Sequence, residues 1–394
     1  MTATPEISDD APVWARAEAF PAAPDGWGWT DRKGGQHPVS SLEELAGSIR
    51  EDRSSAIDLV WTPASPRMVV PEEIPELFHA LFHARRRWTA ADLEHSHGQL
   101  KIFGAGVAAM VAMAWWKDQP LLTSTPLGIA LLLFVMFALI PWYQAWKRGR
   151  ELHSWTPESM TAAVAPLRFE TWLDLQRAPF TRLFLVLMTL TGLAQIFSPA
   201  GHSSIVTAGL VKSAYLHGET WRLFTAPFLH GNELHWFMNM GALLYLGRRL
   251  EVLARWPHLV VVFLFSAWVG GEASARFVET MSVGASGGLM GWLGFLLVFE
   301  TLHSRLVPRS SRRRLLAGVA LTALIGLIGY RFIDNAAHAG GLLAGMIYGI
   351  IVFPKSSSPH RPQSTLTDRV VGGLALAATL ASVGFAIWKV LGRS

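Results

Sequence analysis

Two residues that could carry out nucleophilic chemistry lie near the starts of two strongly apolar segments. Ser286 stands in the run GASG, and His338 stands in the run AHAGG. Polar and ionisable groups at membrane depth cost free energy, so they usually mark a functional site. A serine hydroxyl becomes a strong nucleophile when a neighbouring base removes its proton. The pair therefore suggests nucleophilic chemistry inside a membrane.

A second pair of polar residues lies at the start of another apolar segment. His235 and Asn239 are four residues apart, which places both side chains on one face of a helix. Both side chains can donate hydrogen bonds to an oxygen that gains negative charge during a reaction.

Small residues indicate how Ser286 and His338 could meet. Glycines recur at helical spacing on both segments: Gly287, Gly291 and Gly294 on the first, Gly341, Gly345 and Gly349 on the second. Such spacing lets two membrane helices approach closely. We expect Ser286 Oγ to come within hydrogen-bond reach of His338, about 2.6–3.2 Å.

The elements that must position these residues are membrane helices. The chain is 51% hydrophobic and only 16% charged, below the roughly 25% charge of soluble domains. Nine apolar runs are candidate spans, judged against the roughly 17–25 residues that a bilayer needs. They lie at about 100–116, 126–142, 183–197, 234–250, 259–271, 286–302, 315–330, 336–353 and 370–388. The first two could instead form a re-entrant or interfacial hairpin.

The basic residues predict the orientation of these spans. With nine spans, every Lys/Arg cluster falls on one side, whereas the loops 198–233, 272–285 and 331–335 are poor in Lys and Arg. Positive loops face the cytoplasm. We expect a cytoplasmic N-terminus, an external Ser394 and location in a bacterial inner (plasma) membrane. Ser286 and His338 then lie at similar shallow depth below the outer face.

The N-terminal region is soluble in character. Residues 1–25 are expected to be disordered. Ser41 followed by Glu44 predicts a helix near 42–50. A strand is expected at 57–61 and a further helix from residue 71.

The order of Trp, Gly, Pro-Val-Ser, Leu-Glu-Glu-Leu and Val-Trp over residues 26–80 resembles the GYF-like domains found beside bacterial membrane segments. That resemblance implies a module that binds a cytoplasmic protein or peptide. The alternative is that its tryptophans only form a core.

The middle of the chain resembles the rhomboid intramembrane serine proteases over about residues 180–353. The matching residues are Trp221, Arg222, His230, His235, Asn239, Tyr245, Leu246, Gly247, Glu251, Gly284, Ser286, Gly287, Ala337, His338, Gly341 and Gly345. Several motifs in the same order make this match more specific than Gly-x-Ser-Gly alone.

The resemblance implies a role for each matching residue. Ser286 is the nucleophile and His338 the general base, a dyad without an acidic third member. His235, Asn239 and the Ser286 N–H form the oxyanion hole. Supporting roles fall to Gly284, Gly287, Trp221, Arg222 and His230. Substrates would be single-span or polytopic membrane proteins, cleaved near the outer face at small residues.

One position departs from the family pattern. Many members carry a tyrosine four residues after the nucleophile, where it stacks on the catalytic histidine, and this chain has Met290. A thioether can contact a ring edge but offers no flat face. The alternative function is therefore an inactive rhomboid-like protein that binds membrane clients.

Other classes of function are disfavoured. There is no cysteine and no His-Glu-x-x-His motif, and the net charge of +5 comes from clusters beside apolar runs. We expect no metal, no cofactor and no nucleic-acid partner.

The predicted fold is an all-α polytopic membrane protein with a small soluble α+β domain. Its expected parts are residues 26–99 (GYF-like domain), 100–146 (transmembrane hairpin), 147–182 (cytoplasmic linker), 183–353 (six-helix rhomboid core) and 354–394 (linker and C-terminal helix).

Overall fold

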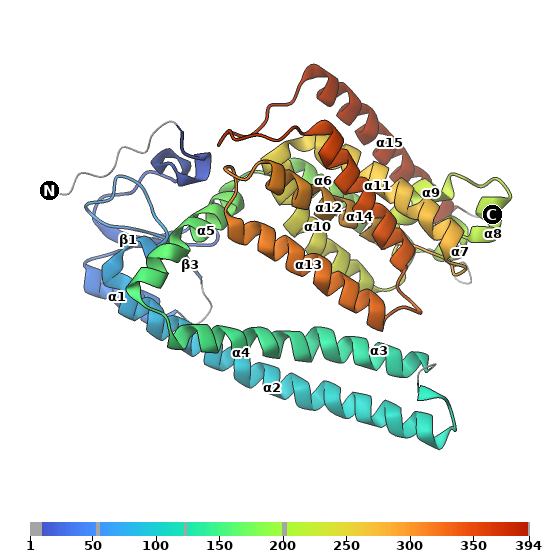
Figure 1. Ribbon diagram of the computed structural model, residues 1–394, viewed down its shortest axis with the longest axis horizontal. Helices are drawn as coiled ribbons and strands as arrows, with labels where there is room; N and C mark the ends of the chain where they lie inside the picture. Colours follow the sequence, from blue (N-terminus) through green and yellow to red (C-terminus); the bar gives the residue numbers. More distant parts are fainter. Residues whose placement is uncertain (1–9, 53–55, 122–123, 199–202, 393–394) are drawn as a thin grey trace. The chain divides into compact units, whose positions relative to one another are not determined.

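The computed structural model describes residues 10–52, 56–121, 124–198 and 203–392. The chain forms two compact units (Figure 1). The first consists of Met1–Trp172 with Ala323–Arg331, and the second of Leu173–Thr322 with Phe332–Ser394.

The first unit carries a small antiparallel sheet and one covering helix. Its strands are Trp27–Asp31 (β1), Gln36–Val39 (β2) and Ile57–Trp61 (β3), in the order β2-β1-β3. The helix α1 covers Leu42–Glu51, and the Ser41 hydroxyl caps it by accepting the Glu44 N–H at 3.2 Å. Leu45 and Ile49 of α1 are buried in the same core as Val60 of β3. The predicted helix, strand and α+β character are confirmed.

Residues 10–25 contain defined elements where disorder was expected. The 3-10 helices η1 and η2 cover Val13–Ala15 and Ala17–Ala19. Trp14 and Phe20 are buried, and Trp14 packs edge-on against Phe169 with ring centroids 5.7 Å apart. Two buried aromatic side chains order a segment whose composition resembles that of a disordered tail. Residues 1–9 of the predicted segment lie outside the described residues.

A long helical hairpin follows the sheet. Its elements are Pro71–Glu73 (η3), Pro75–Leu77 (η4), Phe78–Trp116 (α2), Thr125–Phe134 (α3), the π-helix Val135–Leu139 (η6) and Ile140–His153 (α4). Arg148 of α4 binds Asp92 of α2 at 2.7 Å, so the two arms pack against each other. The predicted domain boundary at residues 99 and 100 falls inside α2, because the helix continues from the polar into the apolar sequence.

The predicted linker 147–182 is also largely helical. The end of α4 and the helix α5, Pro157–Leu175, occupy most of it. Arg168 of α5 donates two hydrogen bonds of 2.8 Å to the Glu73 carboxylate and so ties α5 to η3 within the first unit.

The second unit is a helical bundle. Its long helices are Pro179–Ile196 (α6), Glu233–Ala254 (α10), Trp256–Phe277 (α11), Ser286–Leu302 (α12), Asn335–Val352 (α14) and Leu366–Leu391 (α15), together with most of Arg309–Ile328 (α13), whose residues from Ala323 on belong to the first unit. Short elements fill the connection from α6 to α10: Ser204–Ala208 (α7), Lys212–Leu216 (α8), Arg222–Thr225 (α9) and Ala226–Phe228 (η7). This connection, which the predicted orientation places on the outer side, is called the first outer loop below. Helix α12 packs against α10, α11 and α14.

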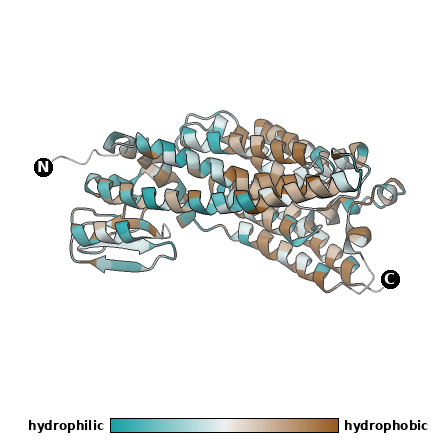
Figure 2. Ribbon diagram, turned by 90° about the horizontal axis from the view of Figure 1, so that it is seen from below, coloured by the Kyte–Doolittle hydropathy of each residue, from teal (hydrophilic) through white to brown (hydrophobic). Residues whose placement is uncertain are grey.

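Six helices in the described residues are long and apolar enough to cross a membrane. They are Pro75–Trp116, Thr125–His153, Pro179–Ile196, Trp256–Phe277, Asn335–Val352 and Leu366–Leu391. Figure 2 shows that many of the helices are largely apolar, whereas the small sheet is mostly polar. Six of the nine predicted spans are thus confirmed by length and composition. The other three are α10, α12 and α13. The apolar α12 has 17 residues, and all three remain predicted spans.

The predicted glycine contacts between α12 and α14 are confirmed. A Cβ atom on Gly341 would lie 2.0 Å from the Gly287 carbonyl oxygen, and one on Gly345 would lie 1.9 Å from that of Gly291. Real Cβ atoms do not approach an oxygen so closely, so only glycine allows this separation of the two helices.

We predict that Gly345→Ala destabilises the protein. The added methyl group must push α14 from α12, and overpacking costs about 1–3 kcal/mol. Thermal unfolding in detergent should show a fall of several degrees in Tm.

Gly384→Ala is the matched control, because a Cβ there meets nothing within 4 Å. Alanine favours a helix over glycine by about 0.8–1 kcal/mol, so this control should keep or raise Tm. Equal changes for the two variants would contradict the close contact.

Candidate active site

The segment before Ser286 is held in an unusual conformation. Gly284 has φ +124°, which favours glycine, and Ser286 is the first residue of α12. The Gly284 N–H donates to the Ala226 carbonyl at 3.0 Å, and Ser282 forms an antiparallel bridge with Leu210. The first outer loop therefore holds the segment that carries Ser286.

His338 lies in the first turn of α14. The Asp334 carboxylate caps this helix by accepting the Ala337 N–H at 2.9 Å. The Ala337 carbonyl lies 3.6 Å from the Cβ position of Gly287. The residue after Ser286 thus lies against the residue before His338.

The hydrogen bond between the two side chains stays a prediction. Within the described part of the chain, no hydrogen bond joins Ser286 to His338, and His338 Nδ1 has no hydrogen-bond partner. Catalytic hydrogen bonds often tighten only when substrate is bound.

The predicted oxyanion pair lies at the start of α10. The Asn232 side chain caps this helix by accepting the His235 N–H at 2.9 Å. A Cβ on Gly284 would lie 2.7 Å from His235 Cε1 and 2.9 Å from Nε2, so the imidazole lies against the loop before Ser286. Asn239 is buried and donates one amide N–H to the His235 carbonyl at 2.9 Å. An asparagine amide has a second N–H that could serve an oxyanion.

Arg222 braces the first outer loop. Its buried guanidinium donates to the carbonyls of Val206 at 3.0 Å and Gly209 at 2.7 Å, and to the Glu219 carboxylate at 2.8 Å. The neighbouring Trp221 ring packs edge-on against Phe385 of α15. Both residues therefore hold the loop through internal contacts.

His230 also supports the site from within the protein. Its ring packs against that of His235 with centroids 5.3 Å apart. Burial lowers the pKa of His230 to about 3, so its ring is neutral near pH 7. Gln195 of α6 accepts the His230 backbone N–H at 2.9 Å.

Met290 is buried one turn after Ser286, with 9% of its surface exposed. How Met290 affects the orientation of the His338 ring stays a prediction. No group of three or more His, Asp or Glu side chains in the described ranges could hold a metal ion.

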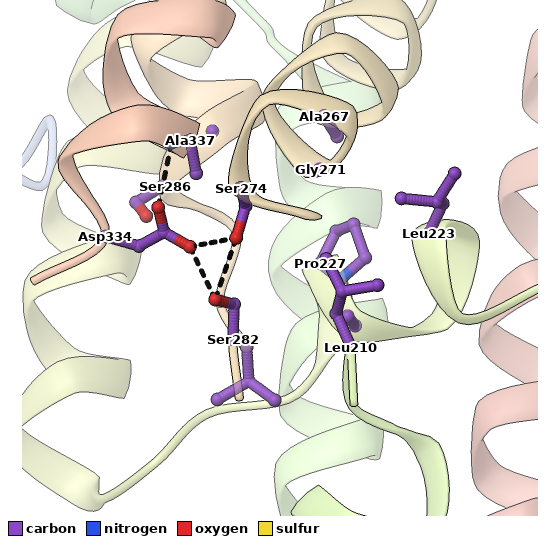
Figure 3. A pocket seen from close by; sticks show the side chains of 14 residues that line it. Leu210, Leu223, Pro227, Ala267, Gly271, Ser274, Ser282, Ser286, Asp334 and Ala337 are labelled. Atoms are coloured by element: carbon purple, nitrogen blue, oxygen red, sulfur yellow. Dashed lines mark hydrogen bonds between the residues drawn. The ribbon is translucent and has the colours of Figure 1, made fainter. Parts of the chain in front are cut away.

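A small cavity of about 40 Å³ lies beside Ser286 (Figure 3). Small residues line part of it, including Ala226, Ala267 and Gly271. Ser274, Ser282 and Asp334 form its polar part. The cavity can accept a small side chain or water, since a water molecule needs about 10–15 Å³ of such space.

Sequence reasoning missed a polar cluster next to this cavity, formed by Lys212, Ser274, Ser282 and Asp334. Both serine hydroxyls donate to Asp334 Oδ2, and Lys212 Nζ donates to each serine at 2.7 Å. Two signals could have found it. Lys212 is the only lysine in the loop 198–233, which is poor in Lys and Arg, and Asp334 precedes His338 by one helical turn.

Known proteins similar to this chain belong to the rhomboid class. Residues 217–355 match the family model described as the rhomboid domain. The chain is 37% identical over 151 residues to RHOMBOID-like protein 6, mitochondrial, of Arabidopsis thaliana, an alignment that covers 37% of this chain and 48% of that protein. It is 31% identical over 137 residues to Inactive rhomboid protein 1 of Bos taurus, covering 34% of this chain and 16% of that protein.

These matches support the rhomboid family for this chain. The rhomboid domain and the apolar helices together identify an integral membrane protein. The chain spans less than half the length of these two relatives. They come from a plant and a mammal and so lend no support to a bacterial origin. The matched region does not include residues 26–80, so the GYF-like character of that region stays a prediction.

We predict that Gly284→Ala slows the reaction of Ser286 with a fluorophosphonate by at least about tenfold. The added methyl group would displace the His235 imidazole, and a misplaced active-site group costs up to about 10²-fold. Gel fluorescence of the labelled protein against time measures the rate.

Gly218→Ala is the control. Gly218 also has a positive φ, of +104°, but a Cβ there meets nothing within 4 Å. It introduces similar backbone strain without touching His235. Equal rates for the two variants would show that strain, and not the His235 contact, matters.

Proposed function

We propose that this protein is an intramembrane serine endopeptidase that cleaves transmembrane substrates near the outer membrane face. The contact between α12 and α14 is the observation that carries the proposal. It brings the first turns of both helices, with Ser286 and His338, into contact through Gly287 and Ala337. The rhomboid-domain match over residues 217–355 agrees with this reading.

In the proposed reaction, Ser286 Oγ attacks the scissile carbonyl carbon while His338 accepts the hydroxyl proton. The carbonyl oxygen becomes an oxyanion, which His235, Asn239 and the Ser286 N–H stabilise. Removing one such donor typically costs about 10²–10³ in kcat. His338 then gives the proton to the leaving amine, and an acyl-enzyme remains. Water, deprotonated by His338, hydrolyses this ester and frees Ser286.

The cavity beside Ser286 supports a preference for substrates with a small side chain at the scissile position. Its volume of about 40 Å³ and its lining by Ala226, Ala267 and Gly271 leave little room for a large side chain. Orientation follows the basic loops: the N-terminus is cytoplasmic, and the site opens to the outer side. The sheet-bearing N-terminal domain would bind a cytoplasmic partner.

The second candidate is an inactive rhomboid-like protein that binds membrane clients. The similarity to a protein named Inactive rhomboid protein 1 favours it, as does Met290 at a position where many family members carry tyrosine. The two candidates share a fold and differ in whether a peptide bond breaks.

We predict that co-expression with a panel of single-span membrane proteins yields at least one cleaved product. Mass spectrometry of the new termini should map the cut near the outer end of the substrate span. Ser286→Ala should abolish the product, because no other group supplies the attacking oxygen.

Ser213→Ala is the control, since Ser213 is an exposed serine of the first outer loop. It should cleave like wild type. If wild type and Ser213→Ala bind membrane clients but cleave none of them, the inactive candidate is favoured. A product that persists with Ser286→Ala would contradict the assigned nucleophile.

A further inference from the structure

The polar cluster of Lys212, Ser274, Ser282 and Asp334 joins four parts of the second unit. Lys212 begins α8 in the first outer loop, and Ser274 lies near the end of α11. Ser282 lies four residues before Ser286, and Asp334 caps α14 four residues before His338. The cluster therefore connects the segments that carry both members of the proposed dyad.

The hydrogen bonds that reach the two charged groups of the cluster are mutually consistent, and they leave no serine proton for the 2.9 Å contact between the Ser274 and Ser282 hydroxyl oxygens. Each serine has one O–H donor, which goes to Asp334 Oδ2. Each serine oxygen accepts from the Lys212 ammonium at 2.7 Å. The other carboxylate oxygen of Asp334 accepts the Ala337 N–H at 2.9 Å. Lys212 and Asp334 thus form an ion pair bridged by two hydroxyl groups (Figure 3 shows the serines and Asp334).

Burial makes this bridge strong. Ser274 is fully buried, and only 8% of the Lys212 surface is exposed. Hydrogen bonds to charged groups contribute more than neutral ones, and a buried charge that loses its partner is costly. Displacing any one of the four segments would leave a buried charge without all of its partners.

We propose that the Lys212–Asp334 bridge positions the Ser286 segment against the first turn of α14, and that its charge state tunes the reactivity of the dyad. The inference rests on the proposed function. Lys212 and Asp334 are positioning residues, since they act through Ser282 and through the cap of α14. Asn239 and His235 are not part of the bridge.

The cluster is not a second nucleophilic site. A serine paired with a lysine can be a nucleophile in other hydrolases. Lys212 Nζ lies 2.7 Å from Ser274 Oγ, close enough for such a pair. However, Ser274 has no exposed surface, and its hydroxyl proton goes to the Asp334 carboxylate. A substrate carbonyl therefore has no access to its oxygen.

The bridge gives the reaction a pH dependence on the alkaline side. Burial lowers the pKa of Lys212 to about 8, and the Asp334 charge partly offsets this effect. Lys212 is therefore positively charged below about pH 8 and neutral above it, where Asp334 loses its counter-charge. We expect the rate to fall as the pH rises through about 8.

Other charged groups near the bridge have their own partners. Glu272 of α11 binds Tyr215 and Arg276, and Arg222 of α9 binds Glu219. His338 of α14 and His235 of α10 are the titratable groups of the site itself.

The test measures the reaction of Ser286 with a fluorophosphonate in the full-length protein, as a maximal rate and a half-saturating concentration. Lys212→Met should lower the maximal rate at pH 7 at least about tenfold, with the half-saturating concentration within about twofold. It should also remove the fall in rate near pH 8. Lys212→Arg, which stays charged, should retain the rate and show no fall in rate near pH 8.

Asp334→Asn gives a second, charge-specific variant, because asparagine caps a helix as well as aspartate does. It should lower the maximal rate as Lys212→Met does. Lys355→Met is the control, since Lys355 is exposed after the end of α14. Wild-type rates and pH profiles in both bridge variants would overturn the proposal.

A thermal double-mutant cycle keeps the test independent of activity. The losses in Tm for Lys212→Met and Asp334→Asn should not add in the double variant, because both remove the same bridge. If wild type does not react with the probe, the proposed function fails. The bridge is then judged on the cycle alone, and additive losses overturn it.

Discussion

The backbone contact between α12 and α14 is the constraint on which the rest of the second unit depends. The Gly287 and Gly291 carbonyl oxygens occupy the space that a side chain at Gly341 or Gly345 would need. Dispersion contacts over this surface replace the hydrophobic driving force that is absent between helices in lipid. Because the contact lies one turn from Ser286 and His338, helix packing and the proposed chemistry share one geometry.

Polar interactions then fix the sliding and rotation of α12 and α14, which the glycine contact alone does not prevent. Two helices in contact can still slide or rotate against each other, so each needs a further contact near its N-terminal end that fixes its position. Gly284 lies against the His235 imidazole and donates to the first outer loop, and Asp334 caps α14. The Lys212–Asp334 bridge joins the segment before Ser286 to the cap of α14. A site built from short segments at the ends of rigid helices needs such support to hold its geometry.

The sequence predicted much of this arrangement, for physical reasons that differ by element. Glycines at helical spacing predicted the α12–α14 contact, and the Ser41–Glu44 pattern predicted α1, because both signals are local. The ordered residues 10–25 and the continuation of α2 through residue 99 could not be predicted this way. The order of residues 10–25 depends on a distant partner, since Trp14 packs against Phe169. Helix α2 crosses residue 99 because one continuous helix contains both the polar and the apolar sequence. The Lys212 cluster was missed because its members come from four separate segments.

The most direct test of the central claim is the position of the covalent adduct formed with a fluorophosphonate. Peptide mapping by tandem mass spectrometry would locate it in the wild-type protein and in His338→Ala. We predict a single adduct on Ser286 in wild type and a loss of at least about 10²-fold in the variant, since the base is removed. An adduct on another residue, or equal modification of Ser286 in both proteins, would contradict the account.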